Sequence, residues 1–160
     1  VHLKEQVVNA MIASHPYEEV AFDLYPLENT FSKFGSGMYG YLSEPVEEEE
    51  FMCKLRDVFR SECIRHSRFT GKKIQKVAVC GGSGSFLLRR ALDIKADVFI
   101  SADFKYHQFF EAEGRILMVD TGHYESEQFT KELFYEFLIK KFPTFALHLS
   151  KINTNPIHYL

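Results

Sequence analysis

Ile116-Leu-Met-Val-Asp-Thr-Gly-His-Tyr-Glu-Ser-Glu127 has the pattern of a buried strand that leads directly into a helix. Its first four residues are all apolar, as in a strand covered on both faces. His123 and Glu127 follow at a spacing of four, which places both on one face of a helix with Cβ atoms about 5–6 Å apart. An imidazole and a carboxylate at that distance can bind one divalent metal.

A structural role explains the same residues. Asp120 and Thr121 can form a helix N-cap region, and Glu125 and Glu127 suit a first helical turn because the helix dipole favours negative charge there. Two donors are too few to specify a metal, so the spacing alone leaves both interpretations open.

Length and composition indicate a globular chain with a real core. The 160 residues are 46% hydrophobic and 26% charged, and the net charge is -3, so we do not expect nucleic acid or an acidic membrane as a partner. The three cysteines contain no C-x-x-C pair, which favours free thiols in a reducing compartment. No apolar run reaches the roughly 18 residues of a membrane helix, and no secretory signal pattern is present, so we expect a cytoplasmic location.

The first part of the chain predicts a helix and one strand. The helix spans Val1–Ser14, the strand spans Val20–Tyr25, and residues 28–36 form a polar linker. A lone strand is not stable, so we expect it either to join a later sheet or to pair with residues outside this sequence.

After the linker, strands and helices alternate. This order predicts an α/β fold with a mostly parallel or mixed sheet and helices on both faces. The predicted strands are Met38–Leu42, Ile64–Phe69, Ile74–Val79, Ala96–Ser101, Arg115–Val119 and Phe145–Leu149. The predicted helices are Glu47–Arg60, Phe86–Ile94, Asp103–Glu113 and Tyr124–Lys141, the last with Phe129, Leu133, Phe134, Phe137 and Leu138 as its buried face.

Three segments with polar or glycine residues follow predicted strands. They are Cys80–Ser85, which is rich in glycine, Ser101–His107, and Gly122–Glu127. Ligands in open parallel sheets bind beyond the carboxyl ends of the strands, so we expect these segments to line one crevice if the strands adjoin.

Each of the first two segments has two interpretations. Cys80–Ser85 could cradle a phosphate or be a tight turn, and it lacks both common phosphate-binding glycine patterns. Asp103 and His107 repeat the spacing of four, but Asp103 could be only a helix N-cap and His107 a polar residue on a helix face.

Together, three ordered motifs resemble the Nif-three-like family, whose members are often named GTP cyclohydrolase 1 type 2 homologues. The motifs are Ala78–Phe86, Ala96–His107 and Val119–Glu127, and the similarity runs from about Gly35 to Pro156. The opening segment, with His15-Pro-Tyr-Glu-Glu19, resembles the end of a PII-like or CutA-like domain that some members carry as an insertion.

The resemblance implies a domain division. Residues 1–30 would be the last helix and strand of the ferredoxin-like insert, and residues 31–160 the C-terminal half of the family's α/β domain. The N-terminal half has no counterpart here, so we expect the chain to be a fragment of a protein that forms homo-oligomers.

The resemblance also implies a dinuclear metal site. His123 and Glu127 would be ligands, with the carboxylate bridging two divalent ions of zinc, manganese or iron. A histidine pair and an aspartate would come from the absent half, so we expect weak or no metal binding by this chain alone. The implied pocket or supporting residues are Ser101, Asp103, His107, Gly82 and Ser83.

For function, the resemblance implies a metal-dependent hydrolase acting on a nucleotide-like or phosphorylated small molecule, with His107 able to pass protons. The alternative is a non-catalytic metal-binding protein of regulation or assembly, which the PII-like segment favours. A third interpretation is a structural fragment whose function requires the other half.

Overall fold

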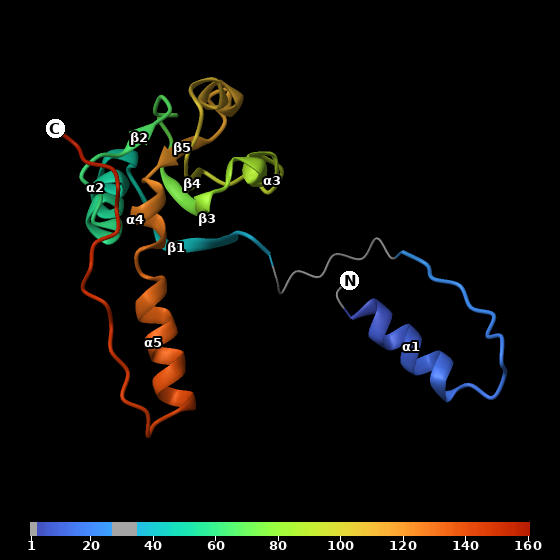
Figure 1. Cartoon of the computed structure of the whole chain (residues 1–160). Coiled ribbons are helices and arrows are strands. Elements are labelled where there is room, and N and C mark those ends of the chain that lie inside the picture. Colours follow the sequence, from blue (N-terminus) through green and yellow to red (C-terminus); the bar gives the residue numbers. More distant parts are fainter. Residues whose placement is uncertain (1–2, 27–34) are drawn as a thin grey trace. The chain divides into compact units, whose positions relative to one another are not determined.

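The computed structural model describes residues 3–26 and 35–160, which belong to two compact units, Val1–Phe34 and Gly35–Leu160 (Figure 1). In the first unit, helix α1 (Lys4–Ser14) agrees with the predicted helix, whose first two residues lie outside the described part. The chain leaves the helix at His15, just before Pro16.

The predicted strand Val20–Tyr25 is wrong, because these residues have no regular secondary structure. Among the residues described in this unit no other strand is present, and an extended segment without a hydrogen-bonded neighbour does not form a sheet. Most of the predicted linker, residues 28–34, lies outside the described residues.

The second unit contains a five-stranded mixed sheet with the order β1-β3-β4-β5-β2, which confirms the predicted fold class. Its parallel centre is formed by β3 (Ile74–Ser83), β4 (Val98–Ala102) and β5 (Leu117–Asp120). The antiparallel edges are β1 (Met38–Val46), beside β3, and β2 (Arg65–His66), beside β5. The carboxyl ends of β3, β4 and β5 therefore meet at one edge of the sheet.

Helices cover both faces of this sheet (Figure 1). Helix α2 (Glu48–Phe59) packs on one face, and the 3-10 segments η1 (Ser85–Leu87) and η2 (Tyr106–Ala112) with α3 (Leu88–Asp93) belong to the other. Side chains alternate along β4, since Val98 and Ile100 pack with Phe51 of α2 while Phe99 packs with Leu88 of α3. Each large apolar side chain buried in this way contributes about 1.5–3 kcal/mol.

The acidic start of α2 does more than complement the helix dipole. Glu48 is buried, and its carboxylate accepts hydrogen bonds from the backbone N–H and hydroxyl of Thr70 and from the N–H of Gly71. It thereby holds the turn that precedes β3.

The predicted helix 124–141 is two helices, α4 (His123–Glu127) and α5 (Thr130–Lys141), separated at Gln128 and Phe129. The periodicity correctly places Leu133, Phe134, Phe137 and Leu138 on one helix, but α5 has no buried residue among those the structure describes. Helical spacing determines which side chains share a face, and a neighbouring element has to cover that face before it is buried.

Three further boundaries differ from the prediction. β3 continues through the glycine-rich segment to Ser83, so that segment ends a strand rather than forming a separate loop. β2 is only Arg65–His66, and the predicted strand Phe145–Leu149 is irregular because no described strand pairs with it. In the described part of the chain, none of the helices has the length and apolar character needed to cross a membrane.

Candidate functional site

The fold gathers three side chains from different segments at the carboxyl edge of the sheet. Ser83 ends β3, Asp103 follows β4, and His123 opens α4 directly after β5. The parallel register pairs Ser83 with Ala102 and Ser101 with Asp120, which sets these ends side by side. The predicted adjacency of these strand ends is therefore confirmed.

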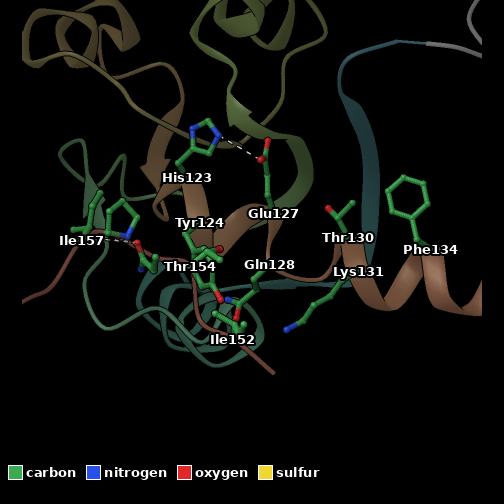
Figure 2. A pocket seen from close by; sticks show the side chains of 12 residues that line it. His123, Tyr124, Glu127, Gln128, Thr130, Lys131, Phe134, Ile152, Thr154 and Ile157 are labelled. Atoms are coloured by element: carbon green, nitrogen blue, oxygen red, sulfur yellow. Dashed lines mark hydrogen bonds and ion pairs between the residues drawn. The ribbon is translucent and has the colours of Figure 1, made fainter. Parts of the chain in front are cut away.

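Asp103, His123 and Glu127 form a connected row. Nδ1 of His123 lies 2.6 Å from Oδ2 of Asp103, and Nε2 of His123 lies 3.3 Å from Oε2 of Glu127 (Figure 2 shows the second pair). The Ser83 hydroxyl donates a hydrogen bond to the same Asp103 oxygen. About half of each side chain in the row is exposed, at 47% for His123, 49% for Asp103 and 52% for Glu127, so a small ligand can reach them.

The hydrogen bonds within the row change how its members titrate. The hydrogen bond to Asp103 is the main reason that the pKa of His123 is raised above 6.5, while partial burial acts in the opposite direction. The pKa of Asp103 is lowered from 3.8, chiefly by the hydrogen bonds from His123 and then from Ser83. An ionised carboxylate only accepts hydrogen bonds, so Nδ1 of His123 is the donor, and a neutral imidazole then presents its Nε2 lone pair beside Glu127.

These atoms fit two ligands of one divalent metal. Bonds of about 2.0–2.2 Å to nitrogen and oxygen put neighbouring ligands about 3.0–3.5 Å apart, which matches the 3.3 Å between His123 Nε2 and Glu127 Oε2. A carboxylate on the second imidazole nitrogen is the usual support of a metal-binding histidine, and Asp103 occupies that position. In residues 3–26 and 35–160, no cluster of three or more His, Cys, Asp or Glu side chains could hold a metal, so the pair amounts to a partial ligand set.

Gly82 gives the Glu127 side chain its space. Its φ of +61° lies in the left-handed region, and a Cβ there would overlap the Glu127 carboxylate and lie 3.3 Å from Cε1 of His123. A Cβ on the neighbouring Gly81 would make only ordinary contacts, at 3.7 Å to the Ser126 carbonyl oxygen and 3.8 Å to Cγ of Glu127. A side chain at position 82 would therefore require the Glu127 carboxylate to move from its place in the row.

Ser126 was not identified from the sequence, although it lies within the central motif. The Gly82 N–H donates to its hydroxyl oxygen at 2.9 Å, and the hydroxyl donates to the His123 carbonyl at 2.9 Å. A serine three residues after a helix start can hydrogen-bond back to the backbone in this way, which is the signal that could have identified it. Ser126 thus ties α4 to the end of β3.

Ser101, predicted to line the pocket, is not part of the row and lies in the interior of the sheet. It is fully buried, donates to the Gly82 carbonyl at 2.8 Å and accepts from the Gly84 N–H at 2.9 Å. Asp120 was interpreted as part of an N-cap, but the cap residue of α4 is Gly122. The buried Asp120 carboxylate instead pairs with Arg65 and accepts from the N–H groups of Phe104 and Gly122.

His107 is not brought to the row. The predicted pairing of Asp103 and His107 on one helix is wrong, because Asp103 has a left-handed φ of 58° and η2 begins only at Tyr106. His107 is exposed, and its side chain forms no hydrogen bond or ion pair with any residue that the structure describes. Asp103 pairs across the sheet edge with His123 instead.

A cavity of about 580 Å³ opens beside the row, between α4, the start of α5 and the C-terminal segment (Figure 2). His123 and Glu127 form one wall, and the remainder is largely apolar, with Tyr124, Phe134 and Ile152 among its members. Its volume is within the range of about 300–1,000 Å³ that is typical of small-molecule sites.

Comparison with known proteins identifies the family to which this chain is similar. The model of the Duf34/NIF3 (NGG1p interacting factor 3) family matches residues 3–156. A Bacillus subtilis protein named GTP cyclohydrolase 1 type 2 homolog is 35% identical over 99% of this chain and 43% of its own length, and one from Halalkalibacterium halodurans is 37% identical over 98% and 43%.

Solved structures of proteins related to NIF3 have a similar fold. A Bacillus cereus protein related to NIF3 superposes with a TM-score of 0.69 at 31% identity, over 99% of this chain and 45% of that one. A Staphylococcus aureus protein gives 0.75 at 25% identity, over 99% and 46%. The chain thus spans less than half the length of the relatives that it matches.

Proposed function

The chain belongs to the Duf34/NIF3 (NGG1p interacting factor 3) family, and on that premise we propose that it supplies His123 and Glu127 to the divalent-metal site of a metal-dependent hydrolase. The observation that carries the proposal is the row Asp103–His123–Glu127, in which a supported imidazole and a carboxylate converge beside an open cavity. The name of the relatives, GTP cyclohydrolase 1 type 2 homolog, supports a hydrolytic class with a nucleotide-like or phosphorylated substrate.

In this proposal each residue of the row has one task. Asp103 accepts a hydrogen bond from the Nδ1–H group and fixes the imidazole, so that Nε2 of His123 stays directed at the metal position. Glu127 provides a second, anionic donor whose position depends on the absence of a side chain at Gly82. Zinc, manganese or iron bound there would act as a Lewis acid toward water and substrate.

The row offers two donors, whereas zinc sites usually have four ligands. We propose that the remaining donors come from the part of the family's length that this chain does not span, with two metals in the complete site. For the 160-residue chain alone this predicts weak binding.

Zinc titration of the chain, followed by the imidazole resonances in NMR spectra, tests the metal assignment. We expect zinc to cause saturable but weak shifts of the His123 imidazole resonances. In His123→Ala zinc should no longer shift any imidazole resonance, and in Glu127→Gln the shifts of His123 should be smaller. His148→Ala is the matched control, because His148 is exposed and does not line the cavity beside the row. Zinc shifts that persist unchanged in His123→Ala would contradict the assignment.

The hydrolytic part needs a protein of the relatives' length that contains this chain. With zinc or manganese present, we expect turnover of phosphoester or nucleotide substrates that His123→Ala abolishes and His148→Ala preserves. Metal binding without turnover of either class would favour the non-catalytic alternative, a metal-binding protein of regulation or assembly.

A further inference from the structure

A second cavity adjoins the one beside the metal row. It has a volume of about 430 Å³, and its own lining includes Arg60, Lys151 and His158. The two cavities are neighbours, because both are lined by Tyr124, Gln128, Lys131, Ile152, Asn155 and Ile157. One extended molecule can therefore occupy both.

The second cavity has an excess of positive charge that comes from three separate segments. Arg60 ends α2, Lys131 lies in the first turn of α5, and Lys151 belongs to the C-terminal segment. Across residues 3–26 and 35–160, none of these three side chains takes part in an ion pair. The ammonium of Lys131 makes only a long contact of 3.4 Å to the Ser150 carbonyl.

Neither carboxylate in the lining forms an ion pair with these cations among the described residues, and the three cations outnumber the two carboxylates. Glu125 is buried and accepts a hydrogen bond from the Asn155 side chain at 3.2 Å, which leaves Glu62 as the second acidic residue. The Arg60 guanidinium lies over the Phe129 ring at 5.2 Å, an arrangement that leaves its N–H edges available to a ligand.

Three cations from separate segments that line one cavity suit a tetrahedral dianion better than a planar carboxylate. A phosphoryl group presents three oxygens to separate donors, whereas a carboxylate presents two oxygens in one plane, best matched by a single arginine. In Figure 2 the ammonium end of Lys131 lies on the side of Gln128 and Ile152, two residues that line both cavities. The first cavity offers the aromatic and aliphatic surfaces of Phe134, Tyr124 and Ile152 to an apolar group.

We propose that the second cavity is a phosphoryl subsite, which binds the phosphate of a small molecule whose apolar or aromatic part fills the first cavity and reaches His123 and Glu127. The inference deepens the proposed function by naming the substrate class as aromatic or heteroaromatic phosphate esters. It rests on the proposed function only for the part of the substrate that reaches His123 and Glu127.

Phosphate binding by the 160-residue chain tests the subsite without any metal. In EDTA-containing buffer, we expect phenyl phosphate to bind about tenfold more tightly than inorganic phosphate, because the ring enters the apolar cavity. Lys151→Gln should weaken both probes about tenfold, since it removes one charge-assisted hydrogen bond. Phe134→Ala should remove the advantage of phenyl phosphate and leave inorganic phosphate binding unchanged.

Two controls separate this result from general charge effects and from the metal site. Lys140→Gln removes an exposed cation of α5 that lines neither cavity, and it should bind both probes like the parent chain. His123→Ala should keep inorganic phosphate binding while it loses zinc binding, so failure of the metal site is distinguishable from failure of the subsite. Lys151 lies in irregular structure, so its substitution is not expected to disturb folding.

The proposal is overturned by any of three results. These are no phosphate binding by the parent chain, an equal loss in Lys140→Gln and Lys151→Gln, and benzoate binding as tightly as phenyl phosphate. Loss confined to Lys151→Gln, with phenyl phosphate preferred over benzoate, supports it.

Discussion

Replacing Gly82 with alanine tests whether the row Asp103–His123–Glu127 depends on the space that a glycine leaves. Gly82 is the residue before the end of β3 and has a φ of +61°, and the added methyl group would overlap the Glu127 carboxylate. The methyl group cannot be accommodated unless Glu127 moves, and Glu127 lies only 3.3 Å from Nε2 of His123. We therefore expect Gly82→Ala to separate the two proposed ligands.

Two effects of different size should follow. The left-handed backbone costs an L-residue about 1–2 kcal/mol, which lowers the free energy of unfolding by that amount. Displacement of Glu127 should weaken zinc binding about 10–100-fold, or about 1.4–2.7 kcal/mol. The fold itself should survive, since domains of this kind are stable by about 5–15 kcal/mol.

The assay is zinc titration followed by NMR, combined with urea denaturation monitored by circular dichroism. Gly81→Ala is the matched control, because a Cβ there would lie 3.7–3.8 Å from its nearest neighbours and Gly81 has no positive φ. It should bind zinc like the parent chain. If Gly82→Ala retains the parent's zinc affinity, the steric argument and the assignment of Glu127 as a ligand are both refuted.

Four other predictions concern charge and burial. Asp103→Asn should lower the pKa of His123 toward 6.5 in an imidazole NMR titration without metal, and an unchanged pKa would refute Asp103 as the cause. The pair's stabilisation should be complete between pH 3.8 and 6.5, declining as pH rises through the raised pKa of His123 or falls through the lowered pKa of Asp103. Glu48→Gln should cost about 1–3 kcal/mol in urea denaturation, against less than about 0.5 kcal/mol for the exposed Glu49→Gln, and equal losses would contradict the capping role. Burial raises the pKa of the Cys80 thiol, so at pH 8 it should react with a thiol reagent more slowly than the two exposed cysteines, and equal rates would show that it is accessible.

The local pattern of the chain was sufficient to predict most elements of the second unit. Apolar runs such as Ile116–Val119 marked the central strands, and the alternation of strands with helices indicated a mixed α/β sheet. These predictions succeed because side chains of a strand covered on both faces must be apolar along its whole length. The predicted strands at 20–25 and 145–149 failed for the complementary reason, since extended residues form a strand only beside another one.

The row Asp103–His123–Glu127 was half predictable. His123 and Glu127 are one helical turn apart, so the sequence alone placed them on a common face, and the helix does begin at His123. The partner of His123 was not predictable in this way. The spacing of four suggested that Asp103 pairs with His107 on one helix. Because Asp103 has a left-handed φ, the two residues do not share a helix, and the carboxylate instead contacts His123, 20 residues away.

Sequence by itself thus determined the order of strands and helices along the chain, the fold class, and the placement of two candidate ligands on one helical face. Each of these depends on residues within a few positions of one another. Tertiary structure decided which strand ends meet, that Gly82 and Ser126 hold α4 against β3, and that Lys131 joins Arg60 and Lys151 around a second cavity. The meeting of the strand ends follows from the parallel register of β3, β4 and β5, whereas the second cavity depends on packing between segments distant in the chain.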